Sequence, residues 1–166
     1  MHSQAIGHQT AASMHVLNLK VPPLALVLLV GAAMWIVTWT VPAFGFTFPA
    51  RHLFAMAAVT AGTAIAGMGF VSFRRAKTTV NPMKPDSSSS LVVSGIYRLT
   101  RNPMYLGFLL ILIGWAIFLS NALAFLLLPA FVRYMSRFQI EPEEQALTSL
   151  FGQAFLSYRS RVRRWM

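Results

Sequence analysis

The sequence predicts an all-α integral membrane protein with about four transmembrane helices and a final amphipathic helix on the cytoplasmic side. The first reason is composition: hydrophobic residues make up 56% of the 166-residue chain and charged residues only 11%. The mean hydropathy of +0.59 is too high for an ordinary soluble domain. The second reason is that the apolar residues form long uncharged runs, and the third is that the positive charge lies between and after these runs.

The first half of the chain contains a tail and two predicted spans. Residues 1–20 are polar and weakly patterned, so we expect a flexible tail whose three histidines are spaced too irregularly for a metal site. Residues 21–73 form the next predicted unit, with uncharged runs at 24–41 and 53–73 that are each long enough to span a bilayer. Small residues that allow close helix packing recur every four positions in the second run: Ala58, Gly62 and Ala66.

Residues 74–166 form the last predicted unit, which begins with a basic loop and continues into a membrane hairpin. The apolar stretch 104–132 is too long for one span of a hydrocarbon core about 30 Å thick. Its polar residues are Ser120 and Asn121, so we expect two antiparallel helices joined by a turn there. Pro129 should kink or loosen the second helix of this hairpin.

The final segment is predicted to be a separate helix that begins at Glu141. Acidic residues and a proline favour a helix start, because they suit the positive end of the helix dipole and the first helical position. Apolar residues then recur on one helical face: Leu147, Leu150, Phe151, Phe155, Tyr158 and Val162. This segment also contains several arginines, so we expect an amphipathic helix that lies on an anionic membrane surface.

The charge distribution predicts orientation and excludes several functions. The formal net charge is +10, and the two strongly basic regions, 74–101 and 133–164, must lie on the same side. By the positive-inside rule both termini are cytoplasmic, which fits a bacterial inner membrane. Membrane contact explains this charge more simply than nucleic acid does. The absence of cysteine excludes disulfides and thiolate chemistry.

Two segments stand out as candidates for chemistry. Three of the four acidic residues fall within 141–144, although they could simply complement the helix dipole at about 0.3 to 1 kcal/mol each. The stretch 95–107 could be an ordinary basic cluster with a helix start. However, Asn102 can cap a helix that begins at Pro103, and a helix amino terminus also attracts a carboxylate or phosphate. Together these segments would suit a zwitterionic ligand such as S-adenosylmethionine.

Several ordered motifs in this half of the chain form a recognisable set: Ser94-Gly95-Ile96-Tyr97-Arg98, Arg101-Asn102-Pro103-Met104-Tyr105-Leu106-Gly107, and Glu143-Glu144. The set resembles the prokaryotic type of the isoprenylcysteine carboxyl methyltransferase family, which is related to the phospholipid N-methyltransferases. The resemblance covers about half of the chain, residues 78–165. It implies that residues 74–166 form a methyltransferase core.

The resemblance also implies a cofactor site and roles for particular residues. S-adenosylmethionine would be held by Ser90, Leu91, Val92, Tyr97, Asn102, Pro103, Met104, Tyr105 and Glu144. Glu143 would lie near the substrate or the methyl group, and Arg137 could orient a carboxylate substrate. Many relatives have histidine where this chain has Asn102, which removes a titratable group. Gln139 stands near the position of a substrate-binding arginine in eukaryotic relatives.

The function expected from these features is methyl transfer to a lipophilic acceptor, small or lipidated, that enters from the membrane. The resemblance implies a carboxylate acceptor, which is already a usable nucleophile. A phospholipid amine or a thiol is the alternative, and either would need a base. A non-enzymatic membrane scaffold would explain the spans but not the ordered polar motifs. No metal is expected, and the sequence leaves the oligomeric state open.

Overall fold

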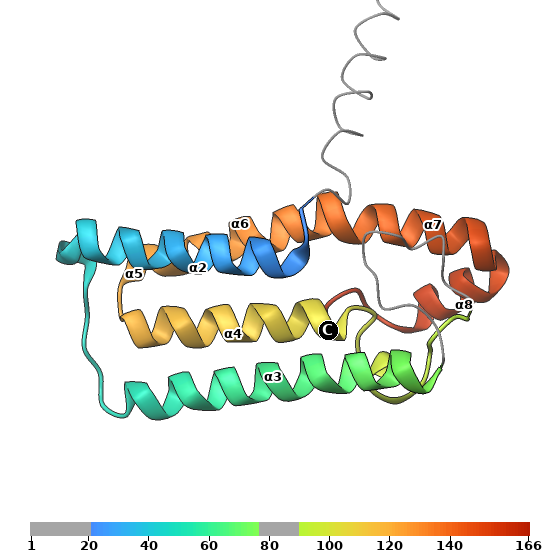
Figure 1. Cartoon of the computed structure of the whole chain (residues 1–166), viewed down its shortest axis with the longest axis horizontal. Helices are drawn as coiled ribbons and strands as arrows, with labels where there is room; N and C mark the ends of the chain where they lie inside the picture. The colour runs from blue at the N-terminus through green and yellow to red at the C-terminus, as the bar shows by residue number, and fades with distance from the viewer. Residues whose placement is uncertain (1–20, 77–89) are drawn as a thin grey trace, which may run out of the picture.

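The computed structural model describes residues 21–76 and 90–166, and they form helices joined by short turns (Figure 1). The predicted amino-terminal tail and most of the predicted basic loop lie outside the described residues. The long helices are α2 (Pro23–Thr40), α3 (Arg51–Arg75) and α4 (Pro103–Leu119). A fourth long helix is assembled from α5 (Ala122–Phe125), α6 (Leu127–Tyr134), the π-helix η4 (Met135–Ile140) and α7 (Glu141–Phe151). The shorter elements are η1 (Pro42–Phe44), η3 (Gly95–Arg98) and α8 (Gln153–Arg161).

Three of these helices are long and apolar enough to cross a membrane: Pro23–Thr40, Arg51–Arg75 and Ala122–Phe151. The all-α membrane fold is therefore confirmed. The fourth apolar helix, α4, has 17 residues, which at 1.5 Å per residue is about 26 Å and slightly shorter than a typical hydrocarbon core. The count of four spans therefore remains a prediction.

Close contact between α3 and α4 confirms the predicted small-residue surface. A Cβ atom built on Gly62 would lie 2.6 Å from the carbonyl oxygen of Gly107. One built on Gly107 would lie 2.5 Å from the carbonyl oxygen of Gly62 and 2.7 Å from Cβ of Ala66. The two backbones can approach this closely only because glycine occupies both positions.

The predicted hairpin is confirmed, with its turn at Ser120 and Asn121. The turn places Ser120 in the left-handed region at φ 52°. Asn121 is fully buried, and its side chain caps α5 by accepting a hydrogen bond from the Leu123 amide at 2.9 Å. Its amide nitrogen donates to the carbonyl of Val41 at 2.9 Å. One side chain therefore ties the hairpin turn to the end of α2.

The long helix from Ala122 to Phe151 differs from the prediction in one respect. Its interruption at Leu126, between α5 and α6, fits the predicted effect of Pro129, whose missing N–H leaves the carbonyl of Phe125 without its usual partner. The helix α7 begins at Glu141 as predicted, but it is not separate from the preceding helix, because it continues directly from η4 with helical backbone at Ile140. A π-helix pairs each carbonyl with the amide five residues on, which accommodates the missing N–H of Pro142.

The predicted single amphipathic helix is also interrupted. Gly152 has φ 49°, a value that favours glycine, and it separates α7 from α8. The predicted apolar face is otherwise mostly correct: Phe155 and Tyr158 are buried, and Leu147, Phe151 and Val162 pack against them. Leu150 is an exception, since 44% of it is exposed.

Two apolar cores hold these helices together. The larger core joins α2, α4 and the long helix α5–α7 through buried residues such as Met34, Leu112 and Phe131. The smaller core lies at the end of the molecule where α8 folds back from α7, near the end of α3 (Figure 1). The long helix has 30 residues, or about 45 Å, so one end of it must extend beyond a hydrocarbon core about 30 Å thick. Since α7 carries the acidic residues, we place that end outside the membrane.

Candidate active site

The half-buried carboxylate of Glu143 joins the start of α4 to the start of α7. The hydroxyl of Tyr105 donates a hydrogen bond to Oε1 of Glu143. Nε2 of Gln139 donates to the same oxygen at 2.9 Å. Tyr105 and Gln139 are only 4% and 3% exposed, respectively. We call Tyr105, Gln139 and Glu143 the carboxylate cluster.

The π-helix positions two members of the carboxylate cluster. Gln139 lies in η4, and Glu143 follows one turn later in α7. A π-turn adds a residue to the turn and so changes which side chains face the bundle, and such segments are frequent at functional sites. Here Gln139 is buried together with its neighbour Ile140. The polar amide is therefore held inside the bundle at the level of Glu143.

A second group of charged side chains surrounds Glu144. Arg101 Nη2 lies 3.2 Å from Glu144 Oε1. Arg164 Nη2 lies 2.8 Å from the other oxygen of the same carboxylate. Hydrogen bonding to Glu144 raises the pKa of Arg164, whereas burial lowers the pKa of Arg101. We call Arg101, Glu144 and Arg164 the arginine cluster.

The residues after α8 form a strap across the site. The amide of Arg101 donates to the carbonyl of Arg163 at 3.0 Å. The carbonyl of Arg164 accepts hydrogen bonds from the side chains of Thr100, at 3.2 Å, and Asn102, at 3.0 Å. We call residues 162–165 the C-terminal strap. It joins the chain end to the segment that leads into α4.

Asn102 occupies the predicted N-cap position but makes no side-chain capping bond to α4. Its side-chain amide bonds the strap instead. The prediction of a capping hydrogen bond is therefore wrong, although the predicted helix start at Pro103 is confirmed. The first amide groups of α4 consequently have no side-chain cap.

The other predicted cofactor residues lie around the smaller core. Tyr97 is 5% exposed, and its carbonyl accepts a hydrogen bond from the hydroxyl of Tyr158 at 2.7 Å. Burial, reinforced by the neighbouring Tyr158 and Glu143, raises the pKa of Tyr97 far above its ordinary value, so the phenol stays neutral. Val92 and Leu91 belong to the same core. Ser90 donates to the carbonyl of Ala76 at 3.2 Å.

The contacts of three further predicted site residues, Pro103, Met104 and Arg137, show where they lie in the fold. Pro103 is fully buried. Met104 faces α3, since a Cβ atom built on Gly69 would lie 3.0 Å from its Cγ. Arg137 pairs with Glu141, one turn further along, at 2.6 Å. Its side chain is 46% exposed, so it does not share the burial of the carboxylate cluster.

The structure thus brings Tyr105 and Glu143 together, as their assignment to one site requires. The sequence analysis did not select Arg101 or Arg164. Arg101 stands directly before Asn102 in a recognised motif, and that position was a usable signal. Arg164 had no such signal, because only the folded strap brings it to Glu144.

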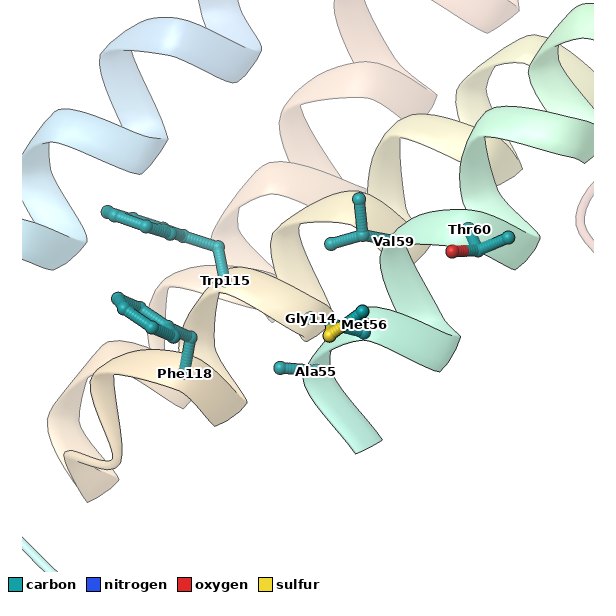
Figure 2. A pocket seen from close by; sticks show the side chains of 7 residues that line it. All are labelled: Ala55, Met56, Val59, Thr60, Gly114, Trp115 and Phe118. Carbon is teal, nitrogen blue, oxygen red and sulfur yellow. The ribbon is translucent and has the colours of Figure 1, made fainter. Parts of the chain in front are cut away.

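A separate pocket of about 290 Å³ lies between α3 and α4, nearer the hairpin turn (Figure 2). It is lined by Ala55, Met56, Val59, Thr60, Gly114, Trp115 and Phe118. Its side chains include one hydroxyl and no ionisable group, so it suits hydrocarbon rather than chemistry. Within residues 21–76 and 90–166, no group of three histidine, aspartate or glutamate side chains is placed to hold a metal.

Comparisons with known proteins agree with this arrangement. The sequence profile of the phospholipid methyltransferase family matches residues 50–154. An uncharacterized protein of Haemophilus influenzae is 44% identical over 63 residues, which is 38% of this chain and all of that protein. Protein-S-isoprenylcysteine O-methyltransferase B of Arabidopsis thaliana is 27% identical over 109 residues, or 66% of this chain and 55% of that protein.

A probable protein-S-isoprenylcysteine O-methyltransferase of Oryza sativa subsp. indica is 32% identical over 107 residues, or 63% of this chain and 54% of that protein. The chain therefore spans about half the length of the isoprenylcysteine methyltransferases it matches. No solved structure matches.

Proposed function

Since the chain belongs to the phospholipid methyltransferase family, we propose that it is a membrane enzyme that transfers a methyl group from S-adenosylmethionine to a lipophilic acceptor. The observation that carries this proposal is the carboxylate cluster, which places a hydrogen-bonded glutamate in the bundle at the start of α4. The helices α3 and α5–α7 that border this end of α4 are long and apolar enough to cross a membrane, so the acceptor would reach it from the lipid. The relatives named as isoprenylcysteine O-methyltransferases support a carboxylate acceptor.

The side chains present fit the proposed cofactor. S-adenosylmethionine, when bound, supplies a methyl group on a positively charged sulfonium and carries an amino acid carboxylate at its other end. Glu143 offers the negative charge that such a sulfonium needs, and the neutral phenol of Tyr97 lies near it. The uncapped start of α4 offers positive potential for the carboxylate. Ser90, Leu91, Val92, Asn102, Pro103 and Met104 complete the proposed binding segment.

The roles of the protein groups follow from their partners. Tyr105 and Gln139 both donate to Oε1 of Glu143, so they fix the direction of its carboxylate. Fixed charges of this kind contribute most where water is excluded. Arg137 would orient a carboxylate acceptor at the membrane exit, and Glu144 would hold the arginine cluster in place. A carboxylate acceptor needs no proton removed, so no step requires Glu143 to act as a base.

A second candidate is methylation of a phospholipid amine or a thiol. One observation favours it: Tyr105 and Gln139 both donate to Oε1 of Glu143, so Oε2 could accept a proton from the acceptor.

Both candidate reactions would take place in a membrane. We propose the bacterial inner membrane, with both termini and the carboxylate cluster on the cytoplasmic side, because the arginines gather at that end.

The test is methyl incorporation by the purified protein in proteoliposomes with methyl-labelled S-adenosylmethionine. N-acetyl-S-farnesylcysteine and phosphatidylethanolamine serve as alternative acceptors. Label on the farnesylcysteine that is released by mild base identifies an ester, whereas base-stable label on the amine supports the second candidate. No incorporation into either acceptor, or into total membrane lipid and protein, would contradict the proposed function.

The Glu143→Gln variant should lower turnover by about a hundredfold or more, because it removes the carboxylate charge but keeps the hydrogen-bonding shape. The control is Gln145→Ala, two residues later on α7 in a side chain that is exposed and outside both clusters. This control should stay within about threefold of wild type, as expected for a surface substitution away from the site. Equal turnover in the two variants would exclude a role for Glu143.

A further inference from the structure

Arg101 is buried with part of its hydrogen-bonding capacity unused. Its side chain is 10% exposed. Among the described residues, its Nε and Nη1 atoms are buried and have no hydrogen-bond partner. A buried donor without a partner costs about 1 to 3 kcal/mol, and more when it is charged. Native proteins rarely carry this cost without a ligand or a function that uses the group.

The charges around Arg101 do not balance. Three guanidinium groups, those of Arg101, Arg137 and Arg164, share the carboxylates of Glu141 and Glu144. Three positive and two negative charges leave one positive charge in excess. Arg164 approaches Glu144 more closely than Arg101 does, at 2.8 Å against 3.2 Å. Arg101 is therefore the less closely paired of the two guanidinium groups at Glu144.

The backbone holds Arg101 beside a second source of positive potential. Arg101 lies two residues before α4, whose first turn has no side-chain cap. Its own amide is fixed by the carbonyl of Arg163 in the C-terminal strap at 3.0 Å. The guanidinium is therefore preorganised near a helix amino terminus that already favours negative charge. Guanidinium groups recognise carboxylates better than ammonium groups do, because they present several donors in one plane.

We propose that the Arg101 guanidinium is a receptor for a ligand carboxylate. This inference rests on the proposed function, which supplies two sources of that carboxylate. The amino acid end of the cofactor is favoured, because Arg101 immediately precedes the segment assigned to the cofactor. The other source is the carboxylate of the acceptor. In both cases Glu144 and the C-terminal strap position Arg101, and the ligand completes its hydrogen bonds.

The test is calorimetric binding of two nucleosides to the purified full-length protein in detergent. S-adenosylhomocysteine carries the amino acid carboxylate, and 5′-methylthioadenosine has the same adenosine and thioether without it. The Arg101→Gln variant should lose about 30-fold or more in affinity for S-adenosylhomocysteine, as expected when one partner of a buried charge pair is removed. Its affinity for 5′-methylthioadenosine should stay within about threefold, because that ligand lacks the carboxylate.

Two further variants separate recognition from folding. Arg101→Lys keeps the charge without the planar donors, so its affinity for S-adenosylhomocysteine should lie between those of wild type and Arg101→Gln. Arg98→Gln removes an equal charge from an exposed side chain three residues earlier, and it should bind both nucleosides like wild type. Thermal unfolding of every variant checks that the protein remains folded.

A second set of binding measurements tests whether the carboxylate bound by Arg101 belongs to the acceptor. If the carboxylate belongs to the acceptor, Arg101→Gln keeps S-adenosylhomocysteine affinity but weakens binding of N-acetyl-S-farnesylcysteine relative to its methyl ester. The inference is overturned if Arg101→Gln weakens both nucleosides equally, or if it changes neither carboxylate ligand. In those cases the proposed function survives. If wild type binds neither nucleoside and neither form of the farnesylcysteine, both the inference and the proposed function fail.

Discussion

Two adjacent glutamates in α7 have different partners and therefore different chemical characters. Glu143 receives hydrogen bonds from the neutral groups of Tyr105 and Gln139, which orient its carboxylate without placing a positive charge beside it. Glu144 lies between the guanidinium groups of Arg101 and Arg164, which neutralise it. Consecutive residues on a helix point about 100° apart, which is why neighbours can serve separate clusters. Glu143 is thus the carboxylate suited to a positively charged ligand, and Glu144 has a positioning role.

Removing the Tyr105 hydroxyl tests how much the fixed orientation of the Glu143 carboxylate contributes to turnover. Tyr105→Phe keeps the buried ring, but it leaves Oε1 of Glu143 with Gln139 alone. We expect turnover to fall by about tenfold to a hundredfold, in line with the loss of one preorganised donor. The measurement is methyl incorporation together with the thermal unfolding midpoint.

The control for Tyr105→Phe is Tyr134→Phe, which also removes a tyrosine hydroxyl. The Tyr134 ring packs against Phe138, with 4.9 Å between the ring centroids. That variant should keep wild-type turnover. If the two substitutions reduce turnover equally, the effect is general to the bundle and the carboxylate cluster has no special role.

At the scale of the helices, the close approach of α3 and α4 fixes the position of the candidate site along the axis of α4. The Gly62 and Gly107 contact lies two residues, or about half a turn, beyond Tyr105 along α4. A larger residue there would push the two helices apart and shift the start of α4. Since Pro103 and Met104 also contact α3 at Gly69, the candidate cofactor segment depends on this interface.

Gly107→Ala should therefore destabilise the protein by about 1 to 3 kcal/mol, as overpacking usually does. The matched control is Gly67→Ala on α3, since a Cβ atom built on Gly67 meets nothing within 4 Å. The control should be neutral or slightly stabilising, because alanine is the better helix former. Unfolding midpoints in detergent measure both, and a stable Gly107→Ala variant would mean that the helices can separate without cost.

The sequence predicted elements better than it predicted their junctions. Long apolar runs and the pair Ser120 and Asn121 located the helices and the hairpin turn, because lipid imposes length and polarity directly. The continuous passage into α7 was missed, because Pro142 has the same local pattern whether it begins a helix or follows a π-turn. Gly152 was likewise not recognised as the break between α7 and α8.

The candidate site was predictable only where its residues lie in local motifs. Tyr105 and Glu143 fall in such motifs and meet in the fold. Arg164 and Glu144 are 20 residues apart and meet only because α8 and the strap fold back. Gln139 faces Glu143 through a π-helix, whose occurrence no periodicity of the sequence indicates. Contacts made by chain reversal and irregular backbone therefore had to come from the structure.

For the whole molecule, the number and direction of the membrane crossings decide which face carries the site. The sequence contains no cysteine, so a single introduced thiol can report its side through a membrane-impermeant maleimide. Thr47, between η1 and α3, and Ser149, in α7, are both exposed. If α3, α4 and the long helix all cross the membrane, three crossings separate Thr47 from Ser149, and the two residues face opposite sides.

We expect the Ser149→Cys variant to react only in inside-out vesicles and the Thr47→Cys variant only in intact cells, because the arginines gather at the Ser149 end. Reaction of both variants from one side would mean that the 17-residue helix α4 does not cross, and the reverse pattern would place the carboxylate cluster outside the cytoplasm.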